Sequence, residues 1–347
     1  VEGASHEQPL DPATGTTVTI NRETGGTQRS MGTFAQAHVW PASRLSLTFS
    51  GRIDHWRNYD ARHNEFSAAT GAPTASHRGA LPDKEDTVFS PRVGALYHLT
   101  DRASVWGSLG WGFRAPTLNE LYRQFSVGNI VTLANPELKP ERLVGGELGV
   151  NLAPIDPLTI RATWFDNRVK DPISNVTLLN VANRRQRQNL GRTRIRGFQT
   201  DVEYRLADDW RVSAGYVFNR ARVTENALSA EQVGQVLPQP ELVGKFLAQV
   251  PENRGSVSLS YSNPRYLTAT VNAIFVGDQF DDDLNTLVLP AYGVVELSVS
   301  RAVARHVELF LTAQNLFDKE YYVQRNPTTL GAPRLVSGGF RVRFAGR

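Results

Sequence analysis

A short acidic segment is the first part of this chain whose residue types could do chemistry. It holds four aspartates, Asp278, Asp281, Asp282 and Asp283. Calcium and other hard cations take carboxylate oxygens as ligands, so Asp281, Asp282 and Asp283 are candidate metal ligands. The segment lacks the Asp-x-Asp-x-Asp-Gly spacing of a calcium loop. We therefore favour a solvated acidic loop, and the metal stays unknown.

The seven histidines offer a second place to look for a metal. They show no His-Glu-x-x-His spacing or other metal-binding spacing. Three of them, His55, His63 and His77, flank or occupy one predicted loop and could hold iron or a metal chelate. Histidines in a loop are more often structural than metal-binding, so this is the lesser hypothesis.

Six charged residues indicate a network inside the fold rather than an active site: Arg142, Glu147, Arg161, Asp201, Glu203 and Arg205. A pair of acids can do general acid–base catalysis. No nucleophile spacing, phosphate loop, Gly-x-Ser-x-Gly or Ser-x-x-Lys accompanies them. Since buried charges must be paired, we predict that these residues pair across an enclosed polar space. We expect no cofactor and no enzymatic activity.

The composition excludes several classes of protein. Apolar residues make up 40% of the 347 positions, which does not suggest a large soluble core. The sequence contains no apolar run of the roughly 20 residues that a membrane helix needs. Cys is absent, so disulfides and thiolate metal sites are excluded. The 38 basic residues are spread along the whole chain without a clustered stripe, which argues against a nucleic-acid partner.

Alternation with period two is the dominant pattern and predicts β-strands. Leu158, Ile160 and Trp164, for example, alternate with Thr159 and Arg161. We predict about thirteen such strands of around ten residues, the length of a tilted membrane strand. They start near residues 32, 44, 87, 102, 141, 157, 192, 209, 254, 265, 291, 305 and 334.

The connections between these strands alternate between short and long. Short ones include 100–101, 207–208 and 303–304, whereas long ones cover about 59–85, 114–140, 170–190, 222–252, 278–290 and 318–332. Short turns at one end and long loops at the other are typical of outer-membrane barrels. A propeller would instead show shared repeats, and none is evident. The pattern predicts an all-β, antiparallel transmembrane barrel.

Several motifs resemble the TonB-dependent outer-membrane receptor family. Residues 111–122 read WGFRAPTLNELY, residues 135–142 read NPELKPER, residues 189–198 read NLGRTRIRGF and residues 315–322 read NLFDKEYY. The resemblance covers roughly residues 30–347. It implies a barrel of about 22 strands around a plug. Our thirteen strands would be its last ones, with residues 1–31 an extracellular loop and residues 32–347 the C-terminal part of the barrel.

That resemblance also implies a function and partners. The odd strand count, starting from an outer loop, predicts that further N-terminal residues precede this chain, and the resemblance implies that they include the first barrel strands and a plug. We expect a bacterial outer-membrane receptor, monomeric when complete, that contacts lipid and is energised through TonB. The expected cargo is a ferric siderophore, with cobalamin second; no His lies between Arg114 and Asn135, which argues against haem. The alternative is a passive porin-like or autotransporter-like barrel. Phe344 near the end departs from the usual terminal aromatic residue, because three residues follow it.

Candidate ligand contacts lie where the predicted strands meet the outer loops. They are Arg114, Asn119, Glu120, Tyr122, Arg123, Phe125, Trp56, Tyr59, Phe280 and Tyr321. The polar members could instead hold a loop by hydrogen bonds. The aromatic members could instead form the aromatic girdle of a membrane barrel.

Overall fold

The computed structural model describes residues 2–8, 17–179, 181–226, 231–232, 235–236 and 240–343. Fourteen strands follow one another in a single antiparallel sheet, and β4 pairs with β3 off this path. The wall strands are β1 (Glu2–Glu7), β2 (Ile20–Ala42), β3 (Leu45–Ser67), β4 (Gly79–Ala80), β5 (Lys84–Thr100), β6 (Ala103–Arg114), β9 (Glu141–Ile155), β10 (Leu158–Lys170), β13 (Gly191–Ala207), β14 (Trp210–Asn226), β17 (Asn253–Asn263), β18 (Leu267–Val276), β21 (Tyr292–Ala304), β22 (Val307–Gln314) and β25 (Leu335–Val342).

The connections carry one helix and several short strands. They are α1 (Leu118–Tyr122), β7 (Phe125–Val127), β8 (Ile130–Leu133), β11 (Ile173–Thr177), β12 (Arg184–Asn189), β15 (Glu231–Gln232), β16 (Gln235–Val236), β19 (Gln279–Phe280), β20 (Val288–Leu289), β23 (Tyr322–Arg325) and β24 (Thr328–Leu330). Within the described residues, no helix is both long and apolar enough to cross a membrane.

All thirteen predicted strands are confirmed, and they are the wall strands from β2 to β25. The prediction for the first of them was wrong in its start. β2 begins at Ile20 rather than near residue 32, and β1 occupies part of the segment that we predicted as loop. The alternation is weak over residues 20–31, because polar residues stand at both inward and outward positions there.

The two faces of the wall differ in the way that the alternation predicts. Leu148 lies opposite Trp164, and Trp164 lies opposite Phe198. These three side chains are 61%, 47% and 45% exposed, and they form part of an outward apolar surface. One residue along, Glu147 lies opposite Phe165 on the inner face.

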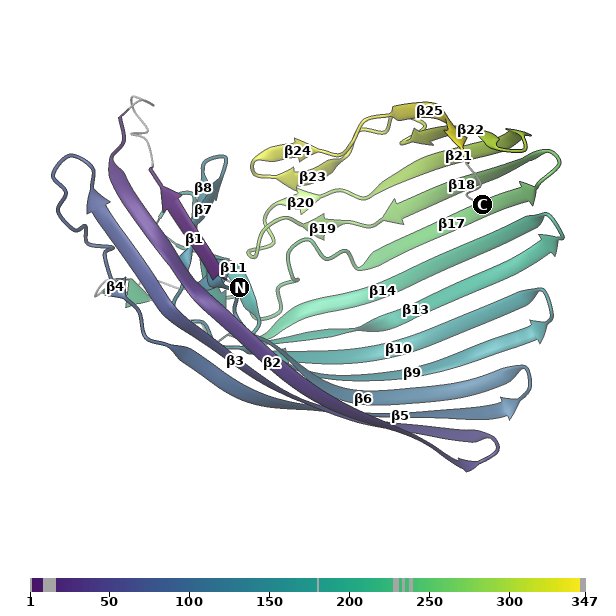
Figure 1. The fold of residues 1–347 in the computed structure, drawn as a ribbon, viewed down its shortest axis with the longest axis horizontal. Coiled ribbons are helices and arrows are strands. Elements are labelled where there is room, and N and C mark those ends of the chain that lie inside the picture. The colour runs from purple at the N-terminus through teal and green to yellow at the C-terminus, as the bar shows by residue number, and fades with distance from the viewer. Residues whose placement is uncertain are drawn as a thin grey trace.

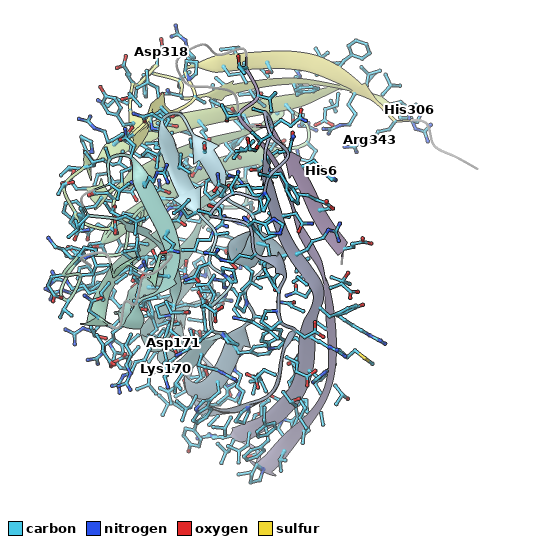
Figure 2. All side chains as sticks on the ribbon, turned by 90° about the vertical axis from the view of Figure 1, so that its left-hand side faces the viewer. His6, Lys170, Asp171, His306, Asp318 and Arg343 are labelled. Atoms are coloured by element: carbon cyan, nitrogen blue, oxygen red, sulfur yellow. The ribbon has the colours of Figure 1, made fainter. Side chains whose placement is uncertain are left out.

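The two ends of the wall also differ. Short turns join the strands at the right-hand end of Figure 1, and the long connections gather at the left-hand end. The short turns follow Ala42, Thr100, Ile155, Ala207, Asn263 and Ala304. Figure 2 looks onto the long-loop end and shows the sheet curving around the loop segments. Phe344 lies outside the described residues.

The described strands do not close the barrel. β1 and β25 are the first and last strands of the sheet, and each pairs with one neighbour only. Two small apolar clusters lie instead on the inner face beneath the long loops. Their buried members are Ala61, Leu121, Tyr122 and Leu138 in one cluster, and Val176, Leu190, Val223 and Leu242 in the other.

One glycine of the wall tests this packing. A Cβ built on Gly197 would overlap the backbone carbonyl of Phe218 on the adjacent strand. We expect Gly197→Ala to lower the free energy of unfolding by about 1–3 kcal/mol, because the wall must shift to admit the methyl group. Urea unfolding of the refolded full-length protein in detergent measures this. Gly94→Ala is the matched control, since its Cβ would meet no atom closer than 3.7 Å; equal losses in both variants would contradict the prediction.

Candidate functional site

Arg114 joins three segments at the long-loop end of the wall. It is the last residue of β6 and lies directly opposite Glu141, the first residue of β9. Its guanidinium donates to both carboxylate oxygens of Glu141 at 2.9 and 2.7 Å, and to Glu120 at 3.0 and 2.9 Å. Glu141 also accepts the backbone N–H of Ile173 at 2.7 Å. Arg114 therefore fixes the loop after β6 and the loop after β10 to one strand pair.

The helix α1 begins at a capping box. The Thr117 hydroxyl accepts the backbone N–H of Glu120 at 3.2 Å, and the Glu120 carboxylate accepts the N–H of Thr117 at 2.8 Å. Such reciprocal bonds satisfy amide groups that a helix start leaves free. Burial alone would raise the pKa of Glu120, but hydrogen bonds from Arg114 and Thr117 outweigh it and hold that pKa below its ordinary value. Glu120 is therefore ionised while it faces Arg114.

Apolar contacts hold α1 against the inner face of the wall. Leu121 and Tyr122 are 0% and 2% exposed and pack with Ala61 of β3. Leu138, from the NPELKPER segment, belongs to the same cluster. The two motifs that lie apart in the sequence therefore meet in one small core.

Arg187 of β12 is a member of this site that we did not predict. It donates to the backbone carbonyls of Asn119 and Arg123, the latter at 2.7 Å, and its guanidinium lies 4.9 Å from the ring centroid of Phe125. Burial lowers the pKa of this guanidinium. A cation at the C-terminal end of a helix is favourable. The run RRQRQN at residues 184–189 is the sequence signal, but nothing local identifies its partner.

The acidic loop is hydrogen-bonded to three other loops, so the prediction of a solvated loop was wrong. Asp281 and Asp282 are 5% and 4% exposed. Asp281 accepts the amide of Gln249 at 2.8 Å and the backbone N–H of Arg325 at 2.9 Å. Asp283 accepts the N–H and hydroxyl of Thr177 at 2.8 and 2.6 Å.

The remaining aspartates of this loop bind their own segment. Asp282 accepts the N–H groups of Thr286 and Leu287 at 2.9 and 2.8 Å, and Asp278 accepts the N–H of Ala291 at 2.6 Å. The neighbouring carboxylates thus serve different amide groups instead of converging. Across the described residues, no three His, Asp or Glu side chains gather closely enough to hold a metal ion.

The predicted ligand contacts fall into distinct groups. Arg114, Asn119, Glu120, Arg123 and Phe125 lie in or next to α1, and of these Arg114, Asn119 and Arg123 are exposed. Tyr122 is buried beneath the helix. The others are placed elsewhere: Trp56 is 3% exposed on the inner face, Tyr59 lies on the outward face beside Arg57, Phe280 stacks on Phe246 at 6.0 Å, and Tyr321 stacks on Tyr292 at 4.1 Å.

The six predicted network charges do not form one network. Arg161 lies directly opposite Asp201, and both line one hollow of the inner face with Glu203. No ion pair among the described residues joins any two of the six; Glu203 pairs with Arg211 at 3.4 Å.

Arg142 lies on the other face of β9 from Glu147, because residues an odd number apart in a strand point to opposite sides. Its partner is Asp86 of β5. Arg205 faces inward with Glu203. The prediction that Arg142 faces inward beside Glu147 was therefore wrong.

Several buried polar atoms beneath α1 have no hydrogen-bond partner among the described residues. They are the hydroxyl of Tyr122, the indole N–H of Trp56 and both amide atoms of Asn58. Asn58 is fully buried. Such atoms cost free energy unless water or another group reaches them.

The comparison with known protein families decides the class of this chain. The family described as TonB dependent receptor-like, beta-barrel matches residues 3–316. The chain belongs to the TonB-dependent receptor family. This confirms the family resemblance of the motifs, and the family is one of receptors rather than enzymes.

Curated relatives and solved structures of TonB-dependent receptors are similar to the chain. The iron-regulated outer membrane virulence protein of Vibrio cholerae is 24% identical over 80% of this chain and 39% of that protein. The probable TonB-dependent siderophore receptor PiuA of Acinetobacter baumannii is 22% identical over 84% of this chain and 38% of that protein. The ferric yersiniabactin uptake receptor FyuA of Yersinia pestis has a TM-score of 0.73 and 17% identity, over 99% of this chain and 50% of that one. The chain thus spans about two fifths of the length of these curated relatives.

The hydroxyl of Tyr122 gives a prediction specific to this TonB-dependent receptor barrel. We expect Tyr122→Phe to leave the free energy of unfolding unchanged or to raise it by about 1 kcal/mol, because it removes a buried hydroxyl without a partner. Leu121→Ala, the neighbouring control, should lower it by about 2–5 kcal/mol. Urea unfolding of the full-length receptor in detergent compares the two. A Tyr122→Phe loss as large as that of Leu121→Ala would show that the hydroxyl is bonded.

Arg114 gives a second prediction, which concerns how firmly the loops are held in place. We expect Arg114→Gln to speed proteolysis of residues 115–140 about fivefold, since it removes on the order of 1 kcal/mol of partly screened ion-pair energy. Limited proteolysis followed by mass spectrometry measures the rate. Arg102→Gln is the control, because Arg102 forms an exposed pair with Asp156 at the short-turn end.

The pH dependence of this protection follows from the lowered pKa of Glu120. A carboxyl whose folded pKa is depressed stabilises the fold above its unfolded pKa and loses that contribution as the pH falls through the folded value. Protection in the wild type should therefore be equal at pH 7 and pH 5.5 and should fall only at more acidic pH. Loss of protection already between pH 7 and pH 5.5 would contradict the assignment.

Proposed function

We propose that this chain forms the C-terminal part of the barrel wall of a bacterial outer-membrane receptor that takes up ferric siderophores, driven through TonB. The long-loop end would face the exterior and the short-turn end the periplasm. The relatives support this, since their names describe iron-regulated and siderophore receptors. A structure of the pyoverdine receptor FpvA from Pseudomonas aeruginosa with bound pyoverdine shares the fold, with a TM-score of 0.63.

The observation that carries the proposal is that the long loops are joined to one another. Arg114 and Glu141 connect the loop after β6 to Ile173. Asp283 connects the loop after β18 to Thr177, and Asp281 connects it to the loops after β14 and β22. A receptor for a bulky chelate needs several loops that present one continuous surface. A passive pore has no need of such contacts.

Three predicted ligand contacts suit this role. Asn119 is exposed on α1, Arg123 is exposed directly after it, and Phe125 is partly exposed beside them. Arg123 carries a positive charge, with Glu7 at 3.5 Å, and Phe125, which has Arg187 over one face of its ring, would offer the other face for stacking with an anionic aromatic chelate. We place Trp56, Tyr59 and Tyr122 outside the ligand site, because two are buried and one faces outward.

The remaining partners follow from the same proposal. TonB would act through parts of the receptor that lie beyond this chain, and the inward charges Glu147, Arg161, Asp201, Glu203 and Arg205 would face the plug. The outward apolar face would contact lipid. The complete receptor would be a monomer.

Uptake by the full-length receptor tests this function. We expect a strain without its own siderophore receptors to regain uptake of radioactive iron from a ferric catecholate when it carries the full-length gene, and to lose it when tonB is deleted. Asn119→Ala/Arg123→Gln should weaken binding of the chelate about tenfold or more, because it removes a charge-assisted contact. Arg102→Gln at the opposite end is the control and should bind like the wild type.

Two other outcomes would replace the proposal. Uptake that persists without tonB would indicate the passive porin-like or autotransporter-like barrel. Uptake of cobalamin without uptake of any ferric chelate would make the vitamin the cargo.

A further inference from the structure

On the outward face of β10, β13 and β14, the side chains change from apolar to basic at one row of aromatic residues. Trp164 of β10 lies opposite Phe198 of β13, which lies opposite Phe218 of β14. The rings of Phe198 and Phe218 stack with centroids 5.8 Å apart. Below this row the outward face is apolar. Aromatic rows of this kind mark the interface level of membrane barrels.

Directly above the aromatic row, the same face turns strongly basic. Every second residue toward the long-loop end continues on the outward side. Seven cationic side chains occupy these positions. One of them, Arg222, lies over the ring of Phe246 at 4.0 Å. We call the other six the outer basic patch: Arg168, Lys170, Arg192, Arg194, Arg196 and Arg220. Lys170 is labelled at the rim of the wall in Figure 2.

The strand register sets like charges against each other within this patch. Arg168 lies directly opposite Arg194, Lys170 opposite Arg192, and Arg196 opposite Arg220. Like charges in directly opposed positions destabilise a sheet. Three such pairs side by side would destabilise the wall unless anions bind near them and offset the repulsion.

The carboxylates of the protein offset only half of these charges. Asp166 pairs with Arg194 and lies 3.9 Å from Arg168. Glu225 lies 3.1 Å from Arg192, and Glu252 lies 4.0 Å from Arg220. Six cations and three carboxylates leave a net charge of +3 on this patch, apart from Arg222. Lys170 and Arg196 form no ion pair within the described part of the chain.

The patch cannot serve the lumen. The residues that alternate with it, Thr193, Ala221 and Val223, are 2%, 2% and 4% exposed and are covered by the long loops on the inner face. The side chains of Arg168 and Arg192 are instead 70% and 60% exposed on the outward side. A siderophore that enters the mouth of the barrel would pass on the other side of the wall.

We infer that the outer basic patch binds the phosphate groups of an anionic lipid in the outer leaflet of the membrane. This rests on the proposed outer-membrane location. Cations just above an aromatic interface row lie at the depth of lipid headgroups. Guanidinium groups match phosphate oxygens bidentately. Because the apolar wall continues below the patch, one lipid can place its acyl chains on Trp164 and Phe198 while its phosphates meet Arg196 and Lys170.

Lipid binding by the full-length receptor in neutral detergent tests this inference. The probes are diphosphoryl lipid A and monophosphoryl lipid A, and the variant Lys170→Gln/Arg196→Gln removes the two cations without ion pairs. Arg161→Gln/Arg205→Gln removes the same charge from the inner face of the same two strands and is the matched control. We expect the patch variant to bind diphosphoryl lipid A about thirtyfold more weakly, at about 1 kcal/mol per cation near a charged surface, and the control to bind within about twofold of the wild type.

Four further measurements make the outcome decisive. Monophosphoryl lipid A should bind the wild type more weakly than the diphosphoryl form, and raised salt should weaken both. Inorganic phosphate at the lipid concentration should not displace the lipid. A heat-shift gel checks that each variant is folded, and we expect Lys170→Gln/Arg196→Gln to fold because it relieves two opposed like-charge pairs.

Several results would overturn the inference. The patch variant and the control could bind diphosphoryl lipid A with equal affinity, or the wild type could bind the two forms of lipid A equally well. Displacement of the lipid by inorganic phosphate would indicate that the patch binds a soluble anion instead. Uptake of ferric chelate by the wild type is measured in parallel. If the wild type transports ferric chelate but lipid binding does not depend on the patch, this inference alone is wrong. If lipid binding depends on the patch but no ferric chelate is transported, the proposed cargo alone is wrong.

Discussion

Backbone hydrogen bonding between neighbouring strands is the constraint on which the rest of this structure depends. Lipid offers no donor or acceptor, so each amide and carbonyl group of the wall must find its partner on an adjacent strand. That requirement forces long antiparallel strands, tight turns at one end and an outward face of apolar side chains. The loops at the other end are not under this requirement, so carboxylates, arginines and a helix can be arranged there for recognition.

The wall could be predicted from the sequence because its signals are local. Each strand carries its own alternation, and each short turn is read within a few residues. The first half of β2 was missed for the same reason, since Arg22 and Thr24 show no apolar alternation of their own. They are buried by contacts with Glu65 and with the α1 segment, which only the folded chain supplies.

The loop chemistry could not be predicted, because its partners lie far apart in the chain. Asp281 is buried by amide groups of Gln249 and Arg325, each more than thirty positions away. Nothing in the local sequence distinguishes such a carboxylate from one in solvent. The positions of the wall charges could not be predicted for a similar reason. Arginines scattered along the sequence become a compact patch once the register of β10, β13 and β14 aligns them, and register is a property of strand pairs rather than of either strand.

The acidic loop after β18 also bears on how such a receptor can diversify. Its carboxylates accept hydrogen bonds from loops that follow three other strands: from the backbone N–H groups of Thr177 and Arg325 and from the side-chain amide of Gln249. Replacing this loop alone with the loop of a relative would leave the backbone N–H groups of Thr177 and Arg325 without the carboxylates that they bind. New specificities in this lineage would then arise by substitution of exposed side chains on a retained loop scaffold, or by exchange of the whole set of loops at once.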